Sequence, residues 1–134
     1  MLTRTQRDTW VRELRNPNNN QARGSLYNNF TKYFDWITGK TELYPAPSRC
    51  CLGVLTECVF GSKPEDMHSL GYLNNEDILG AAEIDEYEYT FPDPEPFSKQ
   101  TLHGQEIFAV LNDQEHWNFN QIADLIETFP VEED

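Results

Sequence analysis

Residues 49–60 restrict the fold of this chain most, because apolar side chains there cover nearly the whole circumference of a helix. A helix that is apolar on nearly all sides is buried, so the other elements must pack around this one. Gly53 lies inside it and costs about 1 kcal/mol relative to Ala, which indicates a close approach by another backbone. Gly61 is placed to end the helix as a C-terminal cap. The apolar positions are Cys51, Leu52, Val54, Leu55, Cys58 and Val59.

The same segment holds all three cysteines, Cys50, Cys51 and Cys58. An odd number with two adjacent residues is not the pattern of a disulfide scaffold, so we expect free thiols in a reducing compartment. Arg49 could make its neighbours reactive, and Cys51 with Cys58 could bind zinc together with a histidine. Zinc sites normally show spaced Cys-x-x-Cys pairs, which are absent here. Because free cysteine is usually buried, we expect core packing, with no metal site and no cofactor.

The remaining patterns predict an α+β fold that is compact, mainly helical and completed by a small antiparallel sheet. The last helix has the clearest signature, since Asn118 can cap it and Gln121 can close a capping box. A chain of 134 residues has the usual size of one domain, so we expect a single domain over residues 1–134. We expect helices at 3–15, 49–60, 74–79, 103–111 and 118–129, short strands at 23–27 and 87–91, and a turn at 112–113.

Large apolar side chains, most of them aromatic, gather between residues 30 and 37. Their spacing fits either a helical turn or an irregular packed loop, and the pattern does not separate the two. The chain as a whole is 13% aromatic, whereas disordered chains are poor in aromatic residues. From this aromatic content we expect a compact domain whose core relies on a few large rings.

Charge is distributed unevenly along the chain. The formal net charge is −13, but residues 1–49 carry +4 and residues 50–134 carry −17. An acidic excess can simply keep a small protein soluble. It also argues against direct binding of nucleic acid, because like charges repel and no basic stripe extends along the domain. No run of residues reaches the ~18–20 apolar positions of a membrane helix, and the first residues lack the apolar stretch of a secretory signal.

Several short motifs occur in a fixed order along nearly the whole chain. They are Trp10-Val11-Arg12-Glu13-Leu14-Arg15, Gly24-Ser25-Leu26, Cys50 through Leu55, Tyr72-Leu73, Leu111-Asn112-Asp113, Phe119-Asn120-Gln121-Ile122-Ala123 and Ile126-Glu127. This pattern resembles a family of short, mostly uncharacterised phage and prophage proteins. The third cysteine departs from it, because Thr56 stands where the family has that cysteine and Cys58 comes two residues later. The resemblance implies a phage accessory protein in the cytoplasm of an infected bacterial host.

No recognised catalytic motif occurs, so no catalytic residue is expected and the chain is more consistent with a binder than with an enzyme. The basic N-terminal third offers guanidinium groups for phosphate and rings for stacking. We therefore expect a non-catalytic counter-defence protein that sequesters a small anionic, nucleotide-type ligand. The candidate binding residues are Arg12, Arg15, Arg23, Arg49, Trp10, Trp36 and Tyr72.

Two alternatives remain open at this point. The acidic run of residues 83–96 could imitate the phosphate charge of nucleic acid and inhibit a host defence protein. A small hydrolase of a nucleotide signal is the other alternative. The same acidic run could also hold a divalent cation, but its spacing does not match a calcium loop. The sequence leaves homo-oligomerisation open.

Overall fold

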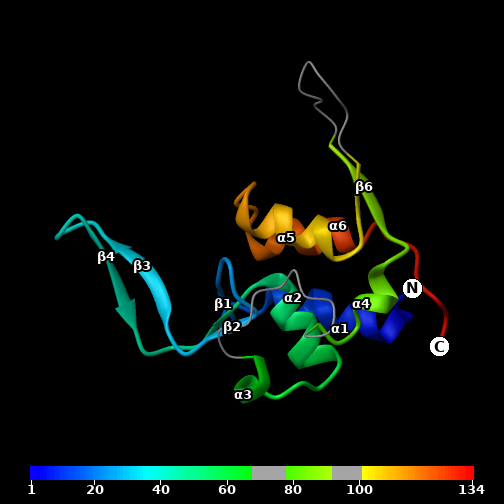
Figure 1. Ribbon diagram of the computed structural model, residues 1–134, viewed down its shortest axis with the longest axis horizontal. Coiled ribbons are helices and arrows are strands. Elements are labelled where there is room, and N and C mark those ends of the chain that lie inside the picture. Colours follow the sequence, from blue (N-terminus) through cyan, green and yellow to red (C-terminus); the bar gives the residue numbers. More distant parts are fainter. Residues whose placement is uncertain (68–77, 92–100) are drawn as a thin grey trace.

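The computed structural model describes residues 1–67, 78–91 and 101–134 and combines helices with small sheets (Figure 1). The α+β class predicted from the sequence is confirmed. The elements are α1 (Arg4–Arg15), β1 (Asn20–Gln21), β2 (Tyr27–Asn28), β3 (Thr31–Asp35), β4 (Lys40–Tyr44), β5 (Ser48–Arg49), α2 (Cys51–Val54), the π-helix η1 (Leu55–Val59), α3 (Pro64–Met67), α4 (Ala81–Ile84), β6 (Glu88–Thr90), β7 (Thr101–His103), α5 (Gln105–Asp113) and α6 (Phe119–Ile126).

The strands in the described ranges form three small sheets rather than the one that we expected. A three-stranded sheet has the order β1-β5-β2, and it is mixed, because β1 pairs with β5 in parallel and β2 pairs with it antiparallel. Strands β3 and β4 form an antiparallel hairpin, as do β6 and β7. Strands thus take a larger share of the fold than "mainly helical" implies.

The apolar segment around Gly53 is the centre of the core, as predicted. Helix α2 is buried along its whole length and continues directly into η1. Gly53 packs against the main chain of Leu26, where a β-carbon would stand 1.9 Å from the carbonyl oxygen. The close backbone approach that the glycine indicated is therefore confirmed. Gly61 follows η1 with a φ of +80°, the left-handed geometry typical of a helix end.

The helix changes from α to π geometry at Leu55, which the apolar pattern does not reveal. Thr56 is fully buried in this turn, and its hydroxyl donates to the carbonyl of Leu52 at 2.7 Å. A threonine that bonds back to the preceding turn satisfies its own hydroxyl without another partner. The widened turn therefore carries a polar residue inside the core without leaving it unsatisfied.

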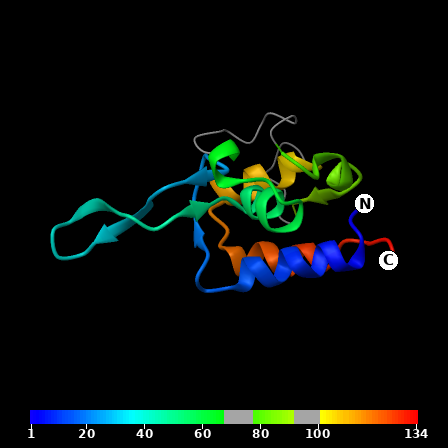
Figure 2. The same ribbon diagram turned by 90° about the horizontal axis from the view of Figure 1, so that it is seen from below.

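The first and last helices lie side by side below this core (Figure 2). Helix α1 begins with a capping box between Thr3 and Gln6, and α6 begins with the predicted one between Asn118 and Gln121. Trp10 of α1 is fully buried and donates its indole N–H to the carbonyl of Cys51 at 3.0 Å. This bond joins the first helix to the buried one. None of the helices in the described ranges is long and apolar enough to cross a membrane.

Four local predictions were wrong. Residues 30–37 form strand β3 and the following turn, because the Asp35 side chain accepts from the Ile37 amide at 2.9 Å and Gly39 has a φ of +71°. Asn112 and Asp113 end helix α5 instead of making a turn. The strand expected at residues 23–27 is reduced to β2, and Gly80 precedes α4 rather than ending a helix. Residues 74–77 of that expected helix lie outside the described residues.

Candidate functional site

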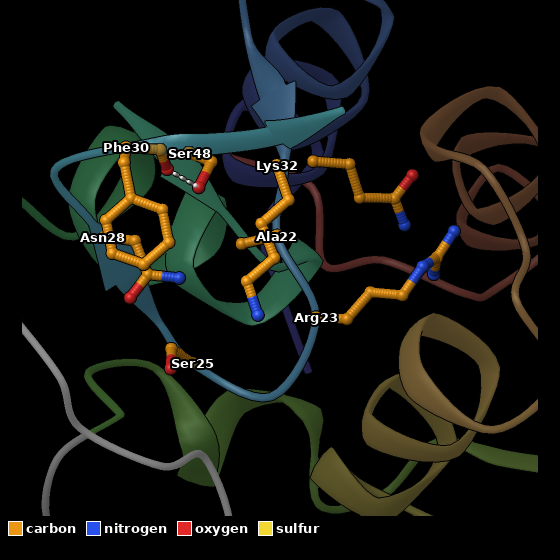
Figure 3. Close-up of a pocket in the computed structure, with 8 residues that line it drawn as sticks. Ala22, Arg23, Ser25, Asn28, Phe30, Lys32 and Ser48 are labelled. Atoms are coloured by element: carbon orange, nitrogen blue, oxygen red, sulfur yellow. Dashed lines mark hydrogen bonds between the residues drawn. The ribbon is translucent and has the colours of Figure 1, made fainter. Parts of the chain in front are cut away.

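A cavity of about 320 Å³ opens between the loop that follows β1 and the root of the β3–β4 hairpin (Figure 3). Its volume lies at the lower end of the range of small-molecule sites, ~300–1,000 Å³. Phe30 flanks the Lys32 side chain on one side and Arg23 flanks it on the other. The described residues that line the cavity are Gln21, Ala22, Arg23, Ser25, Asn28, Phe30, Lys32 and Ser48.

The lining is basic and polar, in contrast to the chain as a whole. Arg23 and Lys32 are cations, and none of the described residues around the cavity is acidic, although the net charge of the chain is −13. Ser25 and Asn28 add a hydroxyl and an amide, and Phe30 adds an aromatic ring. Such a site attracts an anion and can stack a flat group beside it.

Hydrogen bonds between loops give the cavity its shape. Ser48 is buried and donates its hydroxyl to the carbonyl of Phe30 at 2.6 Å, and Thr31 donates to the carbonyl of Ala46 at 2.7 Å. These two bonds hold the start of the hairpin against the chain before β5. On the other side, the Gly24 amide donates to an oxygen of Asp113 at 2.9 Å. Hydrogen bonds therefore fix the wall of the cavity at both of its ends.

Behind the cavity, Asn112 of α5 connects three separate elements. Its side-chain oxygen accepts from Gln21 Nε2 at 2.8 Å and from the Cys51 amide at 3.3 Å. Its amide nitrogen donates to the carbonyl of Ala22 at 2.8 Å. Arg23 donates in turn to the main-chain carbonyl of Asn112. This fully buried residue thus fixes the position of the loop that carries Arg23.

The four arginines proposed from the sequence do not converge on one site. Only Arg23 lines the cavity. Arg12 is exposed on α1, with Glu13 3.7 Å away, and Arg15 reaches α6, where it pairs with carboxylates at 2.7 and 2.6 Å. Arg49 pairs with Glu57 of η1 and lies over the ring of Tyr27, 5.2 Å from its centroid. Three of the four therefore have acidic partners within the chain.

The proposed rings are also separated. Trp10 is fully buried and meets Phe108 edge to face at 4.9 Å, so it has no face open to a ligand. Trp36 is 88% exposed in the turn of the β3–β4 hairpin. Tyr72 lies outside the described residues. Phe30 is the aromatic residue that borders the cavity.

The cysteines pack in the core, as expected from their residue type. Cys50 and Cys51 are fully buried and Cys58 is partly buried. Burial raises the pKa of the Cys50 thiol to about 12 and that of Cys58 to about 11, and it raises the pKa of Cys51 well above its usual range. Across the described ranges, no three His, Cys, Asp or Glu side chains are grouped so that they could hold a metal ion.

The acidic run that motivated the mimicry hypothesis is described only in part. Glu83 and Glu86 lie 3.9 and 3.4 Å from the amino group of Met1, and Glu88 lies 3.9 Å from His103. Residues 92–96 lie outside the described residues. The first two contacts place part of the acidic run beside the positive amino group of Met1.

Sequence reasoning missed Phe30, Lys32 and the small polar residues of the cavity. The sequence pattern puts Phe30 in an aromatic cluster and Lys32 among scattered charges, because no spacing links either residue to Arg23. The available signal was the segment Arg23-Gly24-Ser25, where a cation stands beside a glycine and a hydroxyl. In the structure this glycine has a φ of +86°. No protein-family model, no curated protein and no solved structure matches the chain. The resemblance to phage and prophage proteins therefore stays a prediction.

Proposed function

We propose that this chain is a phage accessory protein that sequesters a small anionic ligand of the nucleotide type, without turning it over, in the cytoplasm of an infected bacterial host. The observation that carries the proposal is the pairing of Arg23 and Lys32 around a cavity with no acidic residue among its described lining. In a chain with a net charge of −13, such a lining favours a negatively charged occupant. The setting in a phage-infected cell rests on the resemblance of the sequence motifs.

The lining supports a nucleotide better than a bare ion. A guanidinium presents a planar fork that matches phosphate oxygens, and an ammonium adds a compact positive charge. Phe30 borders the same space and offers a ring for a base or another flat group. Ser25 and Asn28 supply polar groups for a sugar or for a base edge. Together these residues provide charge, stacking and hydrogen bonds in one cavity.

The lining also favours binding over turnover. Among its described residues there is no His, Cys, Asp or Glu to act as a general base or as an activated nucleophile. Ser48 is the more buried of the two hydroxyl residues in the lining, and it already donates to the carbonyl of Phe30. Ser25 has no described base beside it in the cavity. These features argue against the hydrolase alternative.

Isothermal titration calorimetry tests the proposal with a panel of cyclic and ADP-ribose-derived nucleotides. We expect at least one member to release heat on binding and to be recovered intact from the complex. Arg23→Gln and Lys32→Gln should each weaken that binding about 10- to 100-fold, because a hydrogen bond to a charged group contributes about 1.5–3 kcal/mol.

Arg12→Gln is the matched control, because it removes one positive charge from the same third of the chain at an exposed site outside the cavity. It should leave the affinity within about twofold, since exposed charges act weakly at a distance in salt. No heat with any nucleotide would refute the proposal. Equal losses of nucleotide affinity in all three variants would show a general effect of charge rather than binding at the cavity. Conversion of the nucleotide would favour the hydrolase alternative.

A further inference from the structure

The β3–β4 hairpin projects from the body of the molecule (Figures 1 and 2). It carries most of the large exposed apolar side chains among the described residues. Neither of its strands pairs with a third strand among the described residues. An isolated two-stranded hairpin is at best marginally stable in water, and a third strand or a packed face is needed to stabilise it. The large apolar residues exposed on the hairpin are Tyr33, Phe34, Trp36, Ile37, Leu43 and Tyr44.

The register of the hairpin separates these side chains into two faces. Residues that stand opposite each other in an antiparallel pair share a face. Phe34 is paired with Thr41 and Lys32 with Leu43, and Trp36 continues this set because its ring meets that of Phe34 at 4.7 Å. We call this set, formed by Lys32, Phe34, Trp36, Thr41 and Leu43, the Phe34 face. Ile37 follows it in the exposed turn at the tip of the hairpin. The opposite face holds Thr31, Tyr33, Asp35, Lys40, Glu42 and Tyr44.

The two faces differ in charge. All residues of the hairpin are described, and the Phe34 face contains Lys32 as its sole charged group, whereas the opposite face contains Asp35, Lys40 and Glu42. Two copies of a chain with a net charge of −13 repel each other over most of their surfaces. A face without carboxylates is where two such copies can approach. We propose that the Phe34 face is a dimer interface that packs against the same face of a second copy of this chain.

The exposed apolar area approaches the area that a standard dimer interface buries. Phe34 is 47% exposed, Trp36 88%, Ile37 95% and Leu43 58%. At ~200 Å² for a large side chain, Phe34, Trp36 and Leu43 expose roughly 400 Å², and Ile37 at the adjacent tip of the hairpin adds roughly 200 Å². Standard interfaces bury ~800 Å² on each partner, and the stem of Lys32, Thr41 and the adjacent backbone extend the apolar centre toward that value. A patch of this size matches the largest apolar patch of a typical monomer, which is often functional.

A two-fold axis satisfies this geometry. In such a dimer each hairpin covers the other, so both isolated ribbons gain a packed layer at the ~10 Å spacing of stacked sheets. The same residues serve as both halves of the interface, and no further partner is required. This proposal can be tested separately from the nucleotide site, because its experiments use no ligand.

Sedimentation velocity of the full chain, from low to high micromolar concentration, tests the proposal. We expect the mass to rise with concentration from 15.6 kDa toward twice that value. Phe34→Ser should weaken the dimer tenfold or more, because a large apolar side chain is lost from both copies at the centre of the interface. Tyr33→Ser is the matched control. It is the neighbouring residue, is 44% exposed, and lies on the opposite face, so it should keep the dimer.

Disulfide trapping provides a measurement that does not depend on a destabilising substitution. The Thr41→Cys substitution places a thiol on the Phe34 face, and Glu42→Cys places one on the other face of the same strand. Under mild oxidation we expect a covalent dimer with Thr41→Cys and monomer with Glu42→Cys. A wild-type chain that remains monomeric at every concentration overturns the proposal. A dimer that survives Phe34→Ser, or equal trapping by both cysteines, places the interface elsewhere and overturns it as well.

Discussion

Gly53 lies so close to Leu26 that a β-carbon at position 53 would stand 1.9 Å from the Leu26 carbonyl oxygen. The obstacle is main chain rather than a flexible side chain, so it cannot rotate away. We therefore expect Gly53→Ala to lower the free energy of unfolding by roughly 3 kcal/mol or more, at the upper end of the effects of overpacking. Urea denaturation followed by circular dichroism measures this change.

Gly24→Ala is the control for that substitution. Gly24 has a φ of +86°, and a β-carbon on it would have no neighbouring atom within 4 Å. Gly24→Ala should lower the free energy of unfolding by only about 1–2 kcal/mol, the conformational cost of a left-handed backbone in a residue with a side chain. Equal stability of the two variants would contradict a tight contact between Gly53 and Leu26.

Asn112→Leu should destabilise the protein by about 3 kcal/mol while preserving the volume of the side chain. The substitution leaves the carbonyl of Ala22 and the amide of Cys51 without their partner, and it removes one of the two acceptors of Gln21 Nε2, which keeps the carbonyl of Trp117. A buried polar group without a hydrogen bond costs about 1–3 kcal/mol. The urea midpoint measures the loss. Gln114→Leu makes a similar polar-to-apolar change at an exposed site two residues later and should stay within about 0.5 kcal/mol of wild type.

The ion pair between Arg49 and Glu57 should contribute to stability and not to ligand binding. Both side chains are largely buried, and Arg49 Nη2 donates to Glu57 Oε1 at 3.0 Å. Glu57→Gln should lower the free energy of unfolding by about 1.5–3 kcal/mol, the contribution of a hydrogen bond to a charged group, and leave nucleotide affinity unchanged. Arg15→Gln breaks a more exposed pair and should cost at most about 1 kcal/mol. A large loss of affinity in Glu57→Gln would extend the candidate site to Arg49.

The thiols should be slow to react in the folded protein. Burial raises the pKa of Cys58 from 9.0 to about 11, so at about pH 8 its thiolate is roughly 100-fold scarcer than that of a free cysteine. Cys50 and Cys51 are fully buried. Titration with a thiol-specific disulfide reagent should show one slow site in the native protein and three fast sites in denaturant. A fast native site would make the cysteines functional candidates again.

Stability should fall at alkaline pH for the same reason. Burial raises the pKa of Cys50 from 9.0 to about 12, so the folded state holds this proton more tightly than the unfolded chain does. Unfolding then releases a proton between pH 9 and pH 12, and the free energy of unfolding decreases as pH rises through that window. Urea midpoints at neutral and alkaline pH measure the slope. The Cys50 thiol caps α2 by accepting from the Gly53 amide at 3.3 Å. Cys50→Ser removes the thiol, keeps a side chain that can accept this bond, and should show a shallower decline of the free energy of unfolding.

Features that depend on short stretches of sequence were predictable. The capping box at Asn118 and Gln121, the buried segment around Gly53 and the strand at β6 all follow from neighbouring residues. Local hydrogen bonding and hydrophobic periodicity decide such elements. Gly53 even indicated a long-range contact, because glycine destabilises the interior of a helix unless another backbone needs the space.

The hairpin and the cavity could not be predicted in the same way. Phe34 and Trp36 have the composition of core residues, yet they lie in an exposed ribbon because the turn around Asp35 and Gly39 pairs β3 with β4. The cavity brings Arg23 together with Lys32 through loop contacts made by Asn112 and Ser48. Those contacts join residues far apart in sequence, and no local sequence pattern predicts them.

Lys32 belongs to two places at once, since it lines the cavity and also stands on the Phe34 face, paired with Leu43. An occupant of the cavity that binds the ammonium group and a second copy that covers the hairpin therefore act on one strand. Any effect of the first on the affinity of the second must be returned by the same factor, because coupling free energies are reciprocal. Under these two proposals, such coupling would make the affinity of each cavity for its ligand depend on the protein concentration, and the chain would work as a concentration-dependent trap.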